Sequence, residues 1–174
     1  QEESKKAIKI KKEVVVTTED GKRVSLKPSN RIVYDFEIKF NHPAIGQQKF
    51  HFDYSIAEYK ENISRARTFG FLKDVEQLKA SGLAKGGSLD NCIVLDDTKV
   101  INPDGLRYKD EFVRHKVLDA LGDLVTLEMP LMGHLILHKA GHDIMNKLVR
   151  KIVSQPQSYR FVELGADVSS EIKK

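Results

Sequence analysis

The chain has 174 residues, of which 40% are hydrophobic and 31% are charged, a balance typical of a globular protein rather than a disordered one. No apolar run approaches the roughly 20 residues of a membrane-spanning helix, so we expect no membrane span. The net charge of +4 permits an anionic ligand. Cys92 is the only cysteine, which excludes an internal disulfide and suits a reducing compartment, so we expect a cytoplasmic protein.

The N-terminal third predicts a sheet. Residues 1–12 carry five lysines and no signal-peptide core, and we expect a flexible basic end there, in a chain that is trimmed or part of a longer protein. β-Branched residues predict a strand over 9–18, with a hairpin-type turn at Asp20-Gly21. Strict alternation over 32–40, and again around Phe50 to Tyr54, predicts antiparallel strands with one buried face.

The middle of the chain predicts a smaller unit inserted between the main elements. Ser55 and Glu58 have the spacing of a capping box and predict a helix to about residue 64. A strand, helix and strand succession over about 68–95 indicates a βαβ-type unit, with its helix at 72–81 and a buried strand at 92–95. Its apolar residues either fill a core or line a pocket.

A helix is predicted over residues 110–126, with two different faces. His115, Asp119 and Asp123 follow at intervals of four residues, with Lys116 beside them, and side chains so spaced rise along one side of a helix. An imidazole and a carboxylate in this arrangement can bind one divalent ion, although a solvated surface is the commoner explanation. The opposite arc should pack inward and consists of Val113, Val117, Leu118, Leu121, Leu124 and Val125.

The C-terminal part completes an α+β prediction. Residues 133–139 alternate as a strand with Leu135 and Leu137 toward the core, and a helix is expected over 142–155 before a last strand at 159–164. His142 is a candidate acid or oxyanion partner, or only a capping histidine, and Asp123 could hold it charged. We predict a two-layer sandwich of an antiparallel-rich mixed sheet and helices, with one domain at 13–164 and a tail at 165–174.

Five segments together resemble one enzyme family. The run from Gly105 to Asp123 (GLRYKDEFVRHKVLDALGD) is similar to the signature of the bacterial UDP-3-O-acyl-N-acetylglucosamine deacetylases, zinc enzymes of lipid A biosynthesis in Gram-negative bacteria. The segments FNHP (40–43), SRARTFGF (64–71) and GGSLD (86–90), and the pair Gly141-His142 with Asn146 downstream, agree in order. No zinc-protease motif, hydrolase serine elbow or phosphate-binding glycine loop is present in the sequence.

The resemblance implies a role for each matching residue. His115 and Asp119 would bind Zn²⁺, while His142, oriented by Asp123, would steady the oxyanion and protonate the leaving amine. Thr68 would donate to the substrate carbonyl. Residues implied to touch the UDP-3-O-acyl-N-acetylglucosamine substrate are Lys116 and Lys139 at its anionic part, Phe40 near the uracil, and Phe69, Leu72, Val75, Leu78, Gly87, Leu89 and Val94 around the acyl chain.

The chain departs from the family pattern in two ways. The family's enzyme has two similar halves, and its third zinc histidine and glutamate base belong to the first half, which nothing here matches. We therefore expect the second half alone, inactive until the missing N-terminal half is present. Asp143 and Met145 also stand where the family usually has alanine and asparagine.

The alternative function is that of a non-catalytic basic module that binds an anionic partner. The aromatic residues expected at a nucleic-acid-binding surface are scarce, so we expect no nucleic-acid partner.

Overall fold

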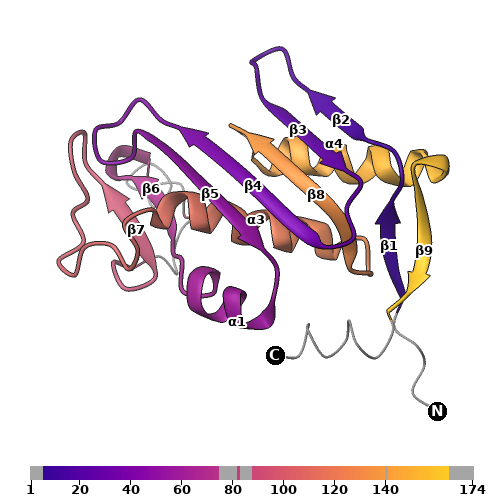
Figure 1. Ribbon diagram of the computed structural model, residues 1–174. Helices are drawn as coiled ribbons and strands as arrows, with labels where there is room; N and C mark the ends of the chain where they lie inside the picture. The colour runs from indigo at the N-terminus through magenta and orange to yellow at the C-terminus, as the bar shows by residue number, and fades with distance from the viewer. Residues whose placement is uncertain (1–5, 75–81, 83–87, 140, 165–174) are drawn as a thin grey trace.

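The computed structural model describes residues 6–74, 82, 88–139 and 141–164. It is an α+β fold in two layers, in which helices α3 (Glu111–Val125) and α4 (His142–Ser154) cover one face of a mixed, mostly antiparallel sheet (Figure 1). The predicted fold class is confirmed. No helix within the described ranges is long and apolar enough to cross a membrane.

Strand β8 (Leu131–His138) lies at the centre of the sheet. On one side it pairs in parallel with β4 (Ile32–Lys39), which pairs antiparallel with β5 (Gln47–Asp53) at the edge. Leu135 and Leu137 are buried against the helices, as their alternation predicts. The opposite face of these three strands is exposed to solvent and carries their polar side chains.

On its other side β8 has two successive neighbours. Its second half pairs antiparallel with β3 (Arg23–Lys27), which forms a hairpin with β2 (Val14–Thr17). Its first residues pair in parallel with β1 (Lys6–Ile10), whose outer neighbour is β9 (Tyr159–Glu163), antiparallel. A short 3₁₀ turn, η2 (Pro156–Ser158), connects α4 to β9.

The prediction of a flexible end over residues 1–12 is wrong for the residues that form β1. Ala7, Ile8 and Ile10 are buried, and the amino group of Lys9 donates to Asn30 at 2.6 Å. The lysines misled the prediction because they alternate with apolar residues that fill the core. The strand expected over 9–18 is also broken in two, since the N–H groups of Lys11 and Lys12 turn to the carbonyl of Ser158.

The helices bury the faces that their sequences predict, with one exception. Ile144, Leu148 and Ile152 of α4 are almost fully buried. On α3 the exception is Val125, which is 72% exposed. It is the last residue of the helix and lies about 100° round the axis from the buried Leu124, at the border of the apolar face, where it lines an open cavity with Leu121 and Ile32.

A two-stranded parallel sheet of β6 (Thr68–Phe71) and β7 (Cys92–Leu95) lies beside the N-terminal part of α3 (Figure 1). This pairing agrees with the expected βαβ-type unit, although most of the helix predicted at 72–81 lies outside the described residues. The hydroxyl of Ser55 accepts from the N–H of Glu58 at 3.0 Å, which confirms the cap. The helix that it begins, α1 (Ile56–Glu58), is short and continues as a π-helical turn, η1 (Tyr59–Ile63).

Candidate metal and catalytic site

The polar row on α3 forms one connected group. Nε2 of His115 lies 3.1 Å from one carboxylate oxygen of Asp119, and the amino group of Lys116 lies 2.8 Å from the other. The side chains of His115 and Asp119 are 13% and 19% exposed, so the pair is largely shielded yet reachable from solvent. This is the geometry that the i, i+4 spacing predicts, and it is not a fully solvated surface.

The second nitrogen of His115 also has a partner. Nδ1 lies 3.3 Å from the carbonyl oxygen of Ala66, which only accepts, so this contact is a hydrogen bond when Nδ1 carries a hydrogen. Nε2 faces a carboxylate oxygen of Asp119, to which it donates when it carries a hydrogen as well. Two acceptors at 3.1 Å repel each other unless a proton or a cation lies between them. The donor set therefore suits a divalent cation such as Zn²⁺.

The environment of Asp119 favours its charged form. Burial alone acts to raise the pKa of Asp119, but the hydrogen bonds from His115 and Lys116 outweigh burial and lower the pKa to about 2. Asp119 is therefore an ionised carboxylate at neutral pH. That is the state in which a carboxylate binds a metal ion.

His142 comes to the same place from the first residue of α4. Its Nδ1 is 3.0 Å from both carboxylate oxygens of Asp123, one turn beyond Asp119 on α3, and its Nε2 is 3.9 Å from Asp119. A carboxylate at Nδ1 holds the hydrogen on that nitrogen and leaves Nε2 directed to the His115–Asp119 pair. The side chain of His142 is 60% exposed, so a substrate can reach it.

Aromatic residues form one wall beside the row. The ring of Phe69 is edge-on to the imidazole of His115 at 6.3 Å, and the amino group of Lys116 lies 5.5 Å from the centre of the same ring. Phe40 packs edge-on against Phe69 at 5.6 Å. Thr68 is exposed and directly precedes Phe69 in β6. The structure thus places Phe69 beside His115 and Lys116, and Phe40 beside Phe69.

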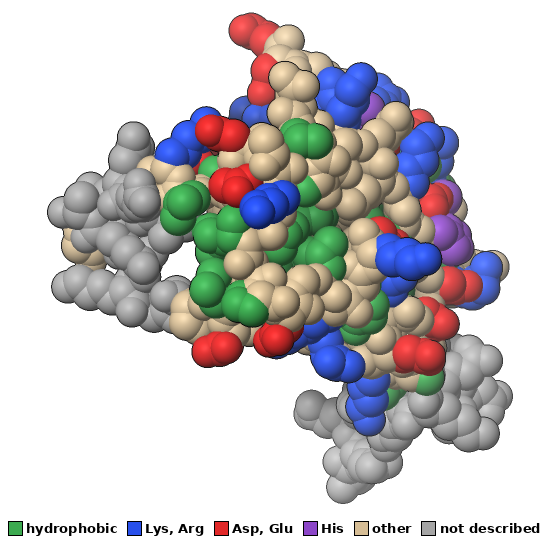
Figure 2. All heavy atoms as spheres, turned by 90° about the vertical axis from the view of Figure 1, so that its left-hand side faces the viewer, with side chains coloured by type: hydrophobic (Ala, Val, Ile, Leu, Met, Phe, Trp, Pro, Cys, Tyr) green, Lys and Arg blue, Asp and Glu red, His purple; other side chains and the backbone are tan. Residues whose placement is uncertain are grey.

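The remaining predicted substrate residues are distributed differently. Leu72 and Leu89 are 37% and 44% exposed, and Figure 2 shows hydrophobic side chains gathered on the face that carries β6 and β7. Val94 is buried in β7 and is not part of an exposed wall. The described contacts of Lys139, which has a left-handed φ of 54° at the end of β8, do not bring it to the His115 row. Val75, Leu78 and Gly87 lie outside the described residues.

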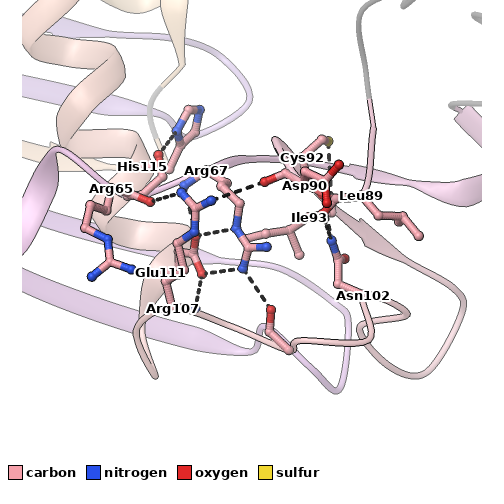
Figure 3. A network of polar contacts seen from close by, with 12 residues as sticks. Arg65, Arg67, Leu89, Asp90, Cys92, Ile93, Asn102, Arg107, Glu111 and His115 are labelled. Carbon is pink, nitrogen blue, oxygen red and sulfur yellow. Dashed lines mark hydrogen bonds and ion pairs between the residues drawn. The ribbon is translucent and has the colours of Figure 1, made fainter.

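One group beside the site escaped the sequence analysis. Glu111, in the first turn of α3, is completely buried and binds the guanidinium of Arg67 through both oxygens, at 2.9 and 3.1 Å (Figure 3). Burial acts to raise the pKa of Glu111, but the hydrogen bonds from Arg67 and Arg107 lower it below its ordinary value. No sequence signal distinguishes Glu111 from an exposed acidic residue at a helix start, which is common there.

One apolar cavity is separate from these polar groups. It has a volume of about 350 Å³ and an apolar lining that includes Tyr34, Tyr54 and Met129, at the C-terminal end of α3. A much smaller hollow lies at the polar row itself, between Lys116, Asp119 and Gly141. The size of a cavity therefore does not identify the candidate catalytic residues of this chain.

His115 and Asp119 are two side chains of the kinds that bind a metal ion. Among the described residues, no group of three or more His, Cys, Asp or Glu side chains has the arrangement of a complete site. A catalytic zinc site usually has three protein ligands and one place for water. His115 and Asp119 thus fit zinc as part of a ligand set.

The fold and this geometry define an α+β protein in which a histidine–aspartate pair on one helix lies beside a second histidine held by a carboxylate. The chain belongs to the UDP-3-O-acyl N-acetylglycosamine deacetylase family, whose model matches residues 1–154. This confirms the resemblance seen in the sequence.

Curated relatives agree with this family. The chain is 62% identical over 98% of its length to a UDP-3-O-acyl-N-acetylglucosamine deacetylase of Aliarcobacter butzleri, and 58% identical over 93% of its length to one of Bdellovibrio bacteriovorus. A third, from Helicobacter hepaticus, is 51% identical over 92% of this chain. The chain spans only 56%, 54% and 53% of these three relatives, about half of each.

Proposed function

We propose that the chain is the second half of a zinc-dependent deacetylase. The complete enzyme hydrolyses the N-acetyl amide of UDP-3-O-acyl-N-acetylglucosamine to the free amine and acetate, a reaction of lipid A biosynthesis. The observation that carries this proposal is that His115 and the Asp123-bound His142 each lie within 4 Å of Asp119 in a chain of the deacetylase family. Family membership favours this function over a non-catalytic basic module.

His115 and Asp119 hold the zinc ion in this proposal, with a third ligand and a general base from residues outside this chain. When bound, zinc polarises a carbonyl oxygen and brings the pKa of bound water to about 7. The chain's own contribution is to orient these two ligands. The carbonyl of Ala66 fixes the ring of His115, and Lys116 holds one oxygen of Asp119.

His142 supplies the proton that the leaving amine needs. Asp123 holds Nδ1–H of the imidazole with both oxygens, and in the charged ring Nε2–H points toward the reacting centre. The positive charge also stabilises the oxyanion that forms when the amide carbon is attacked. After Nε2 gives its proton to the amine, the neutral ring remains held by Asp123.

The other residues bind substrate. The hydroxyl of Thr68 donates to the acetyl carbonyl, and Lys116 and Lys139 balance the charge of the nucleotide. Phe40 stacks near the uracil, and the apolar residues on the β6–β7 face, with Leu72 and Leu89 exposed there, receive the acyl chain. Burial of an alkyl chain is favourable by about 0.8 kcal/mol per CH₂ group, so an apolar passage supplies much of the affinity.

A chimaera tests this function. One polypeptide would join the part of the Aliarcobacter butzleri relative that this chain does not match to these 174 residues, and acetate release from UDP-3-O-acyl-N-acetylglucosamine would be measured. We expect the chimaera to turn over the substrate, a chelator to abolish this activity and zinc to restore it. His142→Ala should abolish turnover, whereas the outer-face control His51→Ala should retain it. The chain alone should show little or none. Near-full turnover by the chain alone would contradict the claim that a third zinc ligand and the general base come from outside this chain. A folded, zinc-loaded but inactive chimaera would contradict the proposed function.

A further inference from the structure

The buried carboxylate of Glu111 is fully occupied by hydrogen bonds. One oxygen accepts from the backbone N–H and from Nε of Arg67, both at 2.9 Å. The other accepts from Nη2 of Arg67 at 3.1 Å and from the backbone N–H of Arg107 at 2.6 Å. Figure 3 shows these contacts converging between α3 and the segment before β6. Two backbone N–H groups are thus fixed to one side chain, which sets the position of the main chain itself.

The segment held in this way is the one that contacts His115. Arg107 donates to the carbonyl of Arg65 at 2.9 Å, and Glu111 grips Arg67, so both neighbours of Ala66 are fixed. The carbonyl of Ala66 is the partner of His115 Nδ1. Glu111 precedes His115 by four residues, so both lie on the same side of α3 (Figure 3). Glu111 fixes the segment, and His115, one turn later, contacts the carbonyl of Ala66 in that segment.

A buried ion pair is by itself weak evidence for stability, because apolar residues of similar volume often replace one without loss. The directional hydrogen bonds to backbone N–H groups indicate instead that this ion pair positions the main chain. Partners of a ligand histidine's second nitrogen fix its tautomer and ring orientation. Here that partner is a backbone carbonyl, which stays in place only if its segment does.

We propose that Glu111 and Arg67 are positioning residues that hold the Ala66 carbonyl in place and thereby fix the orientation of the His115 ring. This inference rests on the proposed role of His115 as a zinc ligand. Neither residue touches substrate or the reacting atoms. Their effect passes through one main-chain carbonyl to the ligand nitrogen.

The test combines two measurements on the metal-stripped chain. Nuclear Overhauser contacts between the ring protons of His115 and Phe69, whose ring centres lie 6.3 Å apart, would report the orientation of the His115 ring, and calorimetry would report zinc affinity. The main variant carries Glu111→Leu and Arg67→Met together, which removes both charges while keeping volume. The control is Asp110→Asn, which removes the negative charge of the ion pair with Arg114 at the same helix start but does not touch residues 65–67.

We expect the unmodified chain and Asp110→Asn to show the same contacts between the His115 and Phe69 rings and equal zinc affinity. The folded paired variant should show weaker ring contacts and zinc affinity lower by about ten- to a hundredfold. If the paired variant does not fold, Arg67→Lys replaces it, because lysine keeps the charge and the backbone N–H but loses the forked contacts of the guanidinium, and a smaller loss of the ring contacts is expected.

Unchanged orientation of the His115 ring in a folded variant would overturn the positioning role. Failure of the unmodified chain and of the chimaera to bind zinc would overturn the proposed function, and the measurement of ring orientation, made without metal, keeps the two results distinguishable.

Discussion

Asp123 contacts one nitrogen of His142 through both of its oxygens, and the consequence of this contact can be measured directly. In Asp123→Asn the side chain loses its charge and one acceptor, so it no longer holds the charged imidazole in one orientation. We expect kcat of the chimaera to fall about 10- to 100-fold with KM nearly unchanged, since the interaction acts on proton transfer rather than on binding.

The matched control for this substitution is Asp143→Asn. Asp143 directly follows His142 and is exposed, so this change removes a nearby charge without the contact at Nδ1. Its kcat should stay within about twofold of the unmodified enzyme, a surface change of small effect. Equal losses in both variants would mean that charge near α4, and not the bond to His142, is what matters.

A second carboxylate, on the outer face of the sheet, predicts a pH effect on stability. Asp35 lies between Nδ1 of His51 at 2.7 Å and Nε2 of His134 at 2.5 Å. Burial acts to raise its pKa, but the hydrogen bonds from the two histidines outweigh burial and lower the pKa below its ordinary value. A lowered folded-state pKa gives stability that is present above the ordinary value near 4 and is lost as pH falls through the folded value.

Urea unfolding at pH 5 and at pH 3 should therefore separate Asp35→Asn from the unmodified chain. We expect the variant to be less stable at pH 5 and the difference to shrink toward pH 3, by less than about 1 kcal/mol because the side chain is 41% exposed and screened by water. The exposed Asp97→Asn is the control for loss of one carboxylate. A difference that grows on acidification would have the wrong sign for this explanation.

Among the elements, the centre of β8 is tightly packed against its neighbours. A Cβ at Gly133 would lie 2.8 Å from Cδ1 of Leu26, and 3.2 Å from Cγ1 of Ile10 and from the carbonyl of Lys27. Gly133→Ala should therefore lower the free energy of unfolding by about 1–3 kcal/mol through overpacking. Thermal or urea unfolding measures it.

The matched control for Gly133→Ala is Gly122→Ala, the same substitution on the exposed side of α3. A Cβ there meets nothing within 4 Å, and alanine is a better helix former than glycine by up to about 1 kcal/mol. The two substitutions should thus act in opposite directions. If both destabilise equally, close packing at β8 is not the cause.

Local pattern predicted the elements and could not predict their pairing. The alternation over 32–40 and the apolar face of α4 mark where a strand and a helix lie, because each depends on neighbours in sequence. The parallel pairings of β8 with β4 and β1 join residues about 100 apart or more, and no local period encodes them. β1 was missed because the lysines within and next to it resemble a solvated end.

The candidate site divides in the same way. His115 and Asp119 could be predicted because helical spacing alone brings them together. The meeting of His142 with Asp123 requires α4 to pack on α3; residue chemistry suggested the pair, but no local spacing predicts their contact, which the family resemblance implied. The bond between Glu111 and Arg67 joins residues 44 apart and has no period or motif. It could be found only from the folded structure.

For the whole molecule, the central claim is that the row on α3 is part of a zinc site in a chain that spans about half of its relatives. A metal site that is assembled from two parts of a protein must show affinity contributed by each part. Two ligands oriented in advance by Ala66 and Lys116 should already bind zinc measurably.

The most direct test is a calorimetric zinc titration of the metal-stripped 174-residue chain at neutral pH, beside its Asp119→Ala variant and the outer-face control His51→Ala. We predict one zinc ion per chain, with affinity unchanged in His51→Ala and weakened at least about tenfold in Asp119→Ala, since one of two protein ligands is lost. Zinc affinity that is the same with and without Asp119, in this chain and in the chimaera alike, would contradict the claim that this row binds the metal.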